Sequence, residues 1–75
     1  MALVTKIEHQ PVQFVARHSS VECTYTIVEV NGEKQLQLDT YGSASRAIPG
    51  KKSQSLRLTS AAMDQLKTII RESGL

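Results

Sequence analysis

The chain has 75 residues, a formal net charge of +2, one cysteine and two histidines. A single cysteine excludes an internal disulfide, and His9 and His18 have no Cys/His cluster around them that could hold a metal ion. No apolar run approaches the roughly 20 residues of a membrane-spanning helix.

The length predicts one small domain over residues 1–75. A domain of this size usually needs a disulfide, a metal or a partner chain to be stable. Since the first two are not available here, we expect a homodimer. No signal peptide is visible, and a lone thiol suits a reducing compartment, so we expect an intracellular, cytoplasmic protein without a membrane partner.

The N-terminal third is only weakly patterned. Residues 1–10 fit either a brief edge strand or a loose arm. After Pro11, the segment 12–18 alternates as a strand does. Its pattern predicts that Phe14 points toward the core and that Arg17 points to the opposite, polar side.

The stretch 21–41 carries the clearest signal in the sequence. Two strand-like runs flank Asn31-Gly32, and this dipeptide favours a two-residue hairpin turn because both residues tolerate positive φ. Such a turn fixes the register, and side chains alternate between faces along each strand. One side, the apolar face, contains Val21, Cys23, Tyr25, Ile27, Leu36, Leu38 and Thr40. The other side, the polar face, contains Glu22, Thr24, Thr26, Val28, Gln35, Gln37, Asp39 and Tyr41.

Residues 42–53 are rich in Gly, Ser, Pro and basic side chains, which predicts a long basic loop. Gly42 and the Gly50-Lys51 pair do not have the spacing of a phosphate-binding P-loop, so we discard that interpretation.

The C-terminal part predicts a strand and then a helix. In residues 53–58, Leu56 and Leu58 alternate with polar residues and are expected in the core. Thr59 or Ser60 can cap the helix, and Gly74 can end it. An apolar stripe at helical spacing follows and is expected to be core or dimer contact: Met63, Leu66, Ile69 and Ile70. The predicted fold is α+β, a curved four-stranded antiparallel β-sheet followed by one C-terminal helix.

No catalytic constellation is visible, and we expect no enzyme and no cofactor. Cys23 falls on the apolar face, where a buried thiol is inert. Glu22 and Asp39 lie diagonally across the hairpin, but nothing in the sequence builds a pocket around this carboxylate pair.

The polar face and the basic loop together suggest single-stranded nucleic acid. Residues 1–45 carry a net charge of −2, whereas residues 46–75 carry +4. Single strands are held by cations along their backbone and by rings that stack on bases. The predicted binding residues are Arg17, Thr24, Thr26, Gln35, Gln37, Tyr41, Arg46, Lys51, Lys52 and Arg57.

Residues 23–70 resemble the single-stranded-DNA-binding domain of transcriptional coactivators of the positive-cofactor type. The resemblance rests on L-Q-L-D-T-Y, on P-G-K-K, and on S-Q-S-L-R-L running into T-S-A-A-M-D-Q-L. It implies a curved four-stranded sheet, dimerisation through the helix region, and single-strand binding on the sheet. It also implies that Tyr41, Lys51 and Lys52 serve the nucleic-acid surface.

Two functions therefore stay open at the level of sequence. The first is a homodimeric domain that binds single-stranded DNA or RNA through the polar face and the basic loop. The second is a homodimeric protein-interaction or assembly module, in which a sheet edge or the helix stripe docks another chain without nucleic-acid activity.

Overall fold

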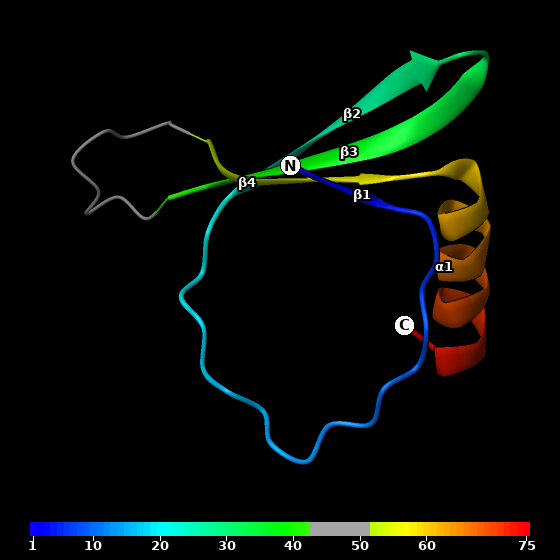
Figure 1. The fold of residues 1–75 in the computed structure, drawn as a ribbon. Coiled ribbons are helices and arrows are strands. Elements are labelled where there is room, and N and C mark those ends of the chain that lie inside the picture. The colour runs from blue at the N-terminus through cyan, green and yellow to red at the C-terminus, as the bar shows by residue number, and fades with distance from the viewer. Residues whose placement is uncertain (43–51) are drawn as a thin grey trace.

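A computed structural model of the chain describes residues 1–42 and 52–75, which form one sheet and one helix (Figure 1). The strands are β1 (Ala2–Val4), β2 (Cys23–Val30), β3 (Glu33–Tyr41) and β4 (Lys52–Leu58), and the helix is α1 (Ser60–Ser73). The strand order is β1-β4-β3-β2. The predicted α+β class, with a four-stranded sheet and a C-terminal helix, is confirmed. The sheet is mixed, because β1 runs parallel to β4 while the other pairs are antiparallel.

The hairpin forms as its turn residues predict. Asn31 has φ 52° and Gly32 has φ 80°, the left-handed values that a two-residue turn of this kind requires. The turn places Val30 opposite Glu33, and the register continues to Cys23 opposite Thr40. The side chains of β4 lie on the same two faces, since Leu56 pairs with Leu38 on the apolar face and Arg57 pairs with Gln37 on the polar face. The two predicted faces are therefore the two faces of the sheet.

The strand expected over residues 12–18 is wrong. The fourth strand is instead β1, which pairs with β4 through Ala2–Leu56 and Val4–Leu58. Residues 11–20 are all exposed, and Phe14 keeps 84% of its side chain in solvent. Alternation defines which way side chains would point, but a strand forms only where a neighbouring strand accepts its backbone hydrogen bonds.

Helix α1 is fixed at both ends and tied to the hairpin. Thr59 is the N-cap, and its Oγ1 accepts the Ala62 N–H at 3.2 Å. The Glu33 carboxylate accepts the Ser60 N–H at 3.3 Å, so the turn end of β3 anchors the start of the helix. Gly74 closes the helix in the left-handed conformation with φ 70°.

Residues 5–22, which we call the arm, connect β1 to β2. Near its start, the Ile7 N–H donates to Gln65 Oε1 at 2.9 Å, and Gln65 Nε2 donates back to the Ile7 carbonyl at 3.1 Å. At its end, the Tyr41 N–H donates to the Glu22 carbonyl at 3.1 Å. Between these anchors the arm sweeps from the helix to β2 in a wide arc (Figure 1).

The apolar core within one chain is small. Leu58 and Ala62 are its buried apolar residues among those described, at the corner where α1 meets the sheet. The rest of the apolar face is largely open, contrary to its predicted place in the core: Tyr25 is 72% exposed, Ile27 59% and Leu56 38%. A single helix at one end of the sheet covers only that end, so most of this face has no partner among residues 1–42 and 52–75.

The turn geometry gives a direct test of the hairpin. A Cβ added at Gly32 meets no other atom within 4 Å, so the cost of a substitution there is conformational strain and not a clash. We expect Gly32→Val to destabilise the fold by about 1–2 kcal/mol, because a branched side chain is disfavoured at positive φ. Gly32→Asn is the matched control and should cost less. Urea unfolding at one fixed protein concentration measures both, and equal midpoints for the two variants would contradict this account.

Candidate nucleic-acid interface

A hydrogen-bonded network crosses the polar face from β3 to β4. Gln37 Oε1 accepts two bonds from Arg57, from Nε at 3.2 Å and from an Nη at 2.8 Å. Gln37 Nε2 donates in turn to both carboxylate oxygens of Asp39, at 3.3 and 3.2 Å. The Ser55 hydroxyl donates to Asp39 Oδ1 at 2.5 Å. The network exists because the strand register sets Gln37 opposite Arg57 and Asp39 opposite Ser55.

Asp39 is the fixed centre of this network, and it is almost completely buried. The Ser55 hydrogen bond, with further contributions from Gln37 and Lys52, lowers the pKa of Asp39 below its usual value, although burial acts in the opposite direction. Asp39 is therefore a stable carboxylate that orients its neighbours. Asp39 bonds to side chains of β3 and β4, and no bond between it and Glu22 is found among the described residues.

A β-bulge brings Lys52 onto the polar face. Thr40 pairs with Gln54, yet Tyr41 pairs with Lys52, so one extra residue of β4 is accommodated between these pairs. An extra residue reverses the alternation of side chains beyond it. Lys52 Nζ consequently lies 3.5 Å from Asp39 Oδ2, and its side chain is more than half exposed. Without the bulge, Lys52 would share the face of Leu56 and Leu58.

Tyr41 closes the polar face on the side of β2. Its hydroxyl lies 2.9 Å from the Thr24 Oγ1, across the hairpin, and this hydrogen bond fixes the ring beside the network. Tyr41 is half-buried and Thr24 is exposed. The ring belongs to the same strand as Gln37 and Asp39, so an aromatic surface, hydroxyls and two cations share one side of the sheet.

Near the hairpin turn, the side chains of the polar face bond to one another and to the start of the helix. Gln35 is 7% exposed, and its Nε2 donates to Glu33 Oε2 at 2.8 Å. This bond and the Ser60 N–H lower the pKa of Glu33. Gln35 thus holds the helix anchor and presents little surface to a ligand.

The predicted binding residues fall into three groups. Thr24, Thr26, Gln37, Tyr41, Lys52 and Arg57 lie together on the polar face. Gln35 is on this face but buried, and Arg17 lies on the exposed arm and not on the sheet, because the expected strand does not form. Arg46, Lys51 and most of the predicted basic loop lie outside the described residues. Lys52 and Ser53 belong to β4, so this loop is shorter than predicted at its C-terminal end.

Sequence reasoning missed the positioning roles of Asp39 and Ser55. Their pairing could have been found by extending the hairpin register to the third strand. The predicted register of β2 and β3 is correct, and Leu56 and Leu58 already indicated which residues of β4 face the other way.

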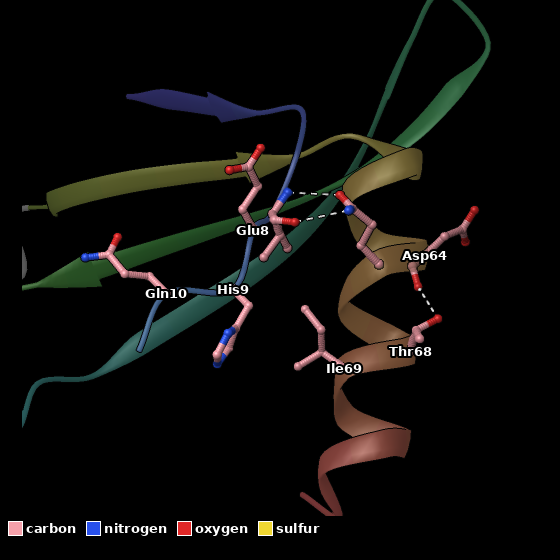
Figure 2. Close-up of a pocket in the computed structure, with 8 residues that line it drawn as sticks. Glu8, His9, Gln10, Asp64, Thr68 and Ile69 are labelled. Atoms are coloured by element: carbon pink, nitrogen blue, oxygen red, sulfur yellow. Dashed lines mark hydrogen bonds between the residues drawn. The ribbon is translucent and has the colours of Figure 1, made fainter. Parts of the chain in front are cut away.

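The apolar stripe of α1 lies partly in solvent. Ile69 and Ile70 are exposed, whereas Met63 and Leu66 are half-buried. Met63 lines a cavity of 300 Å³ with Ile27 and Leu36 of the apolar face. A groove of 590 Å³ separates the start of the arm from the helix, and Figure 2 shows Ile69 facing His9 across it.

Within residues 1–42 and 52–75, no group of three His, Cys, Asp or Glu side chains could hold a metal ion. The helix in this part of the chain is not long and apolar enough to cross a membrane. Comparisons with protein-family models, with curated proteins and with solved structures found no match.

The lowered pKa of Asp39 gives a pH-dependent stability. Its stabilising contribution is fully present above the unfolded pKa of about 3.9 and is lost as the pH falls through the lower, folded value. We expect wild type to be more stable than Asp39→Asn at neutral pH, and the difference to shrink below about pH 4.

Thermal unfolding across this pH range measures the effect. The control is Glu22→Gln, which removes an exposed carboxylate of the same face outside the network, so the loss of the network's stabilisation below about pH 4 should persist in it. A wild-type advantage over Asp39→Asn that stays constant down to low pH would show that the network does not depend on the ionised carboxylate.

Proposed function

We propose that this chain binds single-stranded nucleic acid through the polar face, as a small homodimeric domain of the transcriptional-coactivator type. The observation that supports this most directly is the fixed orientation of Arg57. Two of its N–H groups bond to Gln37, so the remaining three of the five guanidinium donors have no partner among the described residues. A pre-positioned guanidinium suits phosphate, which it can bind through paired hydrogen bonds.

The other side chains of the polar face complete the chemistry of a single-strand site. Lys52 supplies a second cation near the opposite end of β4 from Arg57. Their partners on β3, Tyr41 and Gln37, are four residue steps apart, which is about 13 Å at the usual rise and a path for a few nucleotides. Tyr41 supplies a ring for a base, and Thr24 and Thr26 supply hydroxyls. None of these contacts reads a particular base, so we expect weak sequence preference.

The exposed surface supports the homodimer. One chain exposes 6466 Å², whereas a folded monomer of this mass exposes about 4,600 Å², an excess of about 1,900 Å². The radius of gyration is 14.6 Å, against about 11 Å for a compact chain of this length. Stable interfaces cover about 800 Å² of each partner, so a second copy on the apolar face would cover somewhat less than half of the excess.

The same exposed face favours a second candidate function, an assembly module without nucleic-acid activity. Tyr25, Ile27 and Leu56 form an apolar surface of the kind that marks protein contacts. Oligonucleotide binding distinguishes the two functions. Absence of binding to every oligonucleotide at low salt, with the dimer intact, would leave assembly as the function.

Salt dependence tests the electrostatic part of the proposal. Binding of a fluorescent oligothymidylate should weaken as salt rises, because each cation that contacts a phosphate releases counterions. The double variant Lys52→Gln with Arg57→Gln should reduce the slope of log K against log salt by roughly 1.4, at about 0.7 per lost phosphate contact.

Lys34→Gln is the matched control for this titration. Lys34 also lies on β3 and is exposed, but it shares the apolar side with Leu36. Its removal lowers the net charge by one, half of the change in the double variant, without touching the polar face. A loss of slope of roughly 0.7 in Lys34→Gln, half of that in the double variant, would show that total charge, and not this surface, attracts the strand.

The ring of Tyr41 can be tested apart from its hydroxyl. Tyr41→Leu should weaken oligonucleotide binding by about 1–3 kcal/mol, the value of one base–aromatic stack. Tyr41→Phe keeps the ring and loses only the bond to Thr24, so it should bind nearly as tightly as wild type. Equilibrium titration at low salt measures both. Similar affinities for Tyr41→Leu and Tyr41→Phe would exclude stacking at this position.

A further inference from the structure

The middle of the arm is an apolar segment that lies largely in solvent. Val12 is 72% exposed, Phe14 84% and Val15 94%, so three large apolar side chains within four residues lie in solvent. Residues 8–22 are exposed throughout. Single exposed apolar residues are common on protein surfaces, but a contiguous group of them marks a contact with another molecule.

The two ends of the arm are held in place. The paired hydrogen bonds between Ile7 and Gln65 attach its start to α1, and the bond between Tyr41 and Glu22 attaches its end to the sheet. Between these points the arc runs clear of the sheet and the helix on the side where α1 lies (Figure 1). This is also the side of the apolar face, because Met63 of α1 shares a cavity with Ile27 and Leu36. The arm therefore faces its own uncovered apolar face from a distance.

We propose that the arm of each protomer crosses to a second copy of the chain and packs Val12, Phe14 and Val15 onto that copy. The inference deepens the proposed function, since it rests on the homodimer and specifies its interface. In a two-fold dimer each protomer gives an arm and receives one, so both arms are covered by the same contact.

Charge and surface favour a second copy as the occupant. The arm contains Lys6, Glu8, Arg17 and Glu22, so its formal charge is zero with neutral histidines, and it does not select a strongly charged partner. A second copy brings an apolar sheet face and the exposed Ile69 and Ile70 of its helix. These surfaces are apolar, as the middle of the arm is, and each copy has an arm as well as a surface that can receive one.

The first experiment is sedimentation equilibrium of arm variants. Phe14→Ser with Val15→Ser should raise the dimer dissociation constant at least tenfold, because buried apolar anchors contribute most to an interface. The matched control is Gln13→Ser with His18→Ser, two exposed polar changes in the same segment, which should change it less than about twofold. The helix signal in circular dichroism should be the same in all variants, since the arm variants leave the Ile7–Gln65 bonds intact. A dimer unaffected by Phe14→Ser with Val15→Ser overturns the inference.

The second experiment locates the arm directly. A spin label on Gln13→Cys, in a Cys23→Ser background, is mixed with an equal amount of unlabelled, ¹⁵N-enriched protein. Amide signals of the enriched protomer on the apolar face or on α1, such as those of Ile27, Leu38 and Ile69, should broaden through the mixed dimer. Broadening confined to the spin-labelled chain itself, measured with enriched label-bearing protein, would place the arm on its own sheet and overturn the exchange.

These outcomes are separable from failure of nucleic-acid binding. A dimer with exchanged arms that binds no oligonucleotide keeps this inference and removes the proposed function. A dimer without intermolecular broadening that binds oligonucleotides does the reverse. A monomer at all concentrations removes the exchange and the dimer together, and the oligonucleotide titration then decides whether the polar face binds alone.

Discussion

The structure depends on the register that a two-residue turn imposes on β2 and β3. Asn31 and Gly32 both adopt positive φ, and this conformation permits only one pairing of the strands that follow. A slip by one residue would place Leu36 and Leu38 among the polar side chains and Gln37 and Asp39 among the apolar ones. The register therefore separates a surface suited to water and ions from a surface suited to another protein chain.

The polar face has an acidic residue at its centre, which at first opposes the binding of a polyanion. Asp39 is buried beneath Ser55, Gln37 and Lys52, and its charge is directed to these groups and not to solvent. It fixes Gln37, and Gln37 fixes Arg57. A side chain that is already oriented loses less conformational entropy on binding. For the proposed function, Asp39 would therefore weaken the overall attraction of a polyanion but keep the Arg57 cation in a fixed orientation.

Local features of the fold could be predicted from the sequence, and features that depend on distant partners could not. The hairpin, the faces of β4 and the ends of α1 follow from residues within a few positions of each other, such as Asn31-Gly32 and the Thr59 cap. The prediction of a strand at residues 12–18 was wrong, because the alternating pattern of this segment is present but no neighbouring strand pairs with it among the described residues. β1 pairs with a strand about fifty residues further on, and the bulge that turns Lys52 to the polar face has no signal in the sequence. The hydrophobic pattern predicted which face is apolar, but whether that face is covered depends on other molecules as well as on its own helix.

The central proposal is that one face of the sheet binds a nucleic-acid strand and that the other face contacts a protein chain. An NMR titration of ¹⁵N-enriched protein with a short oligothymidylate tests this division most directly. The account predicts that shift changes concentrate on the polar face, at Thr24, Thr26, Gln37, Tyr41 and Arg57. Changes confined to Tyr25, Ile27, Leu56 and α1, or no changes at low salt, would contradict it.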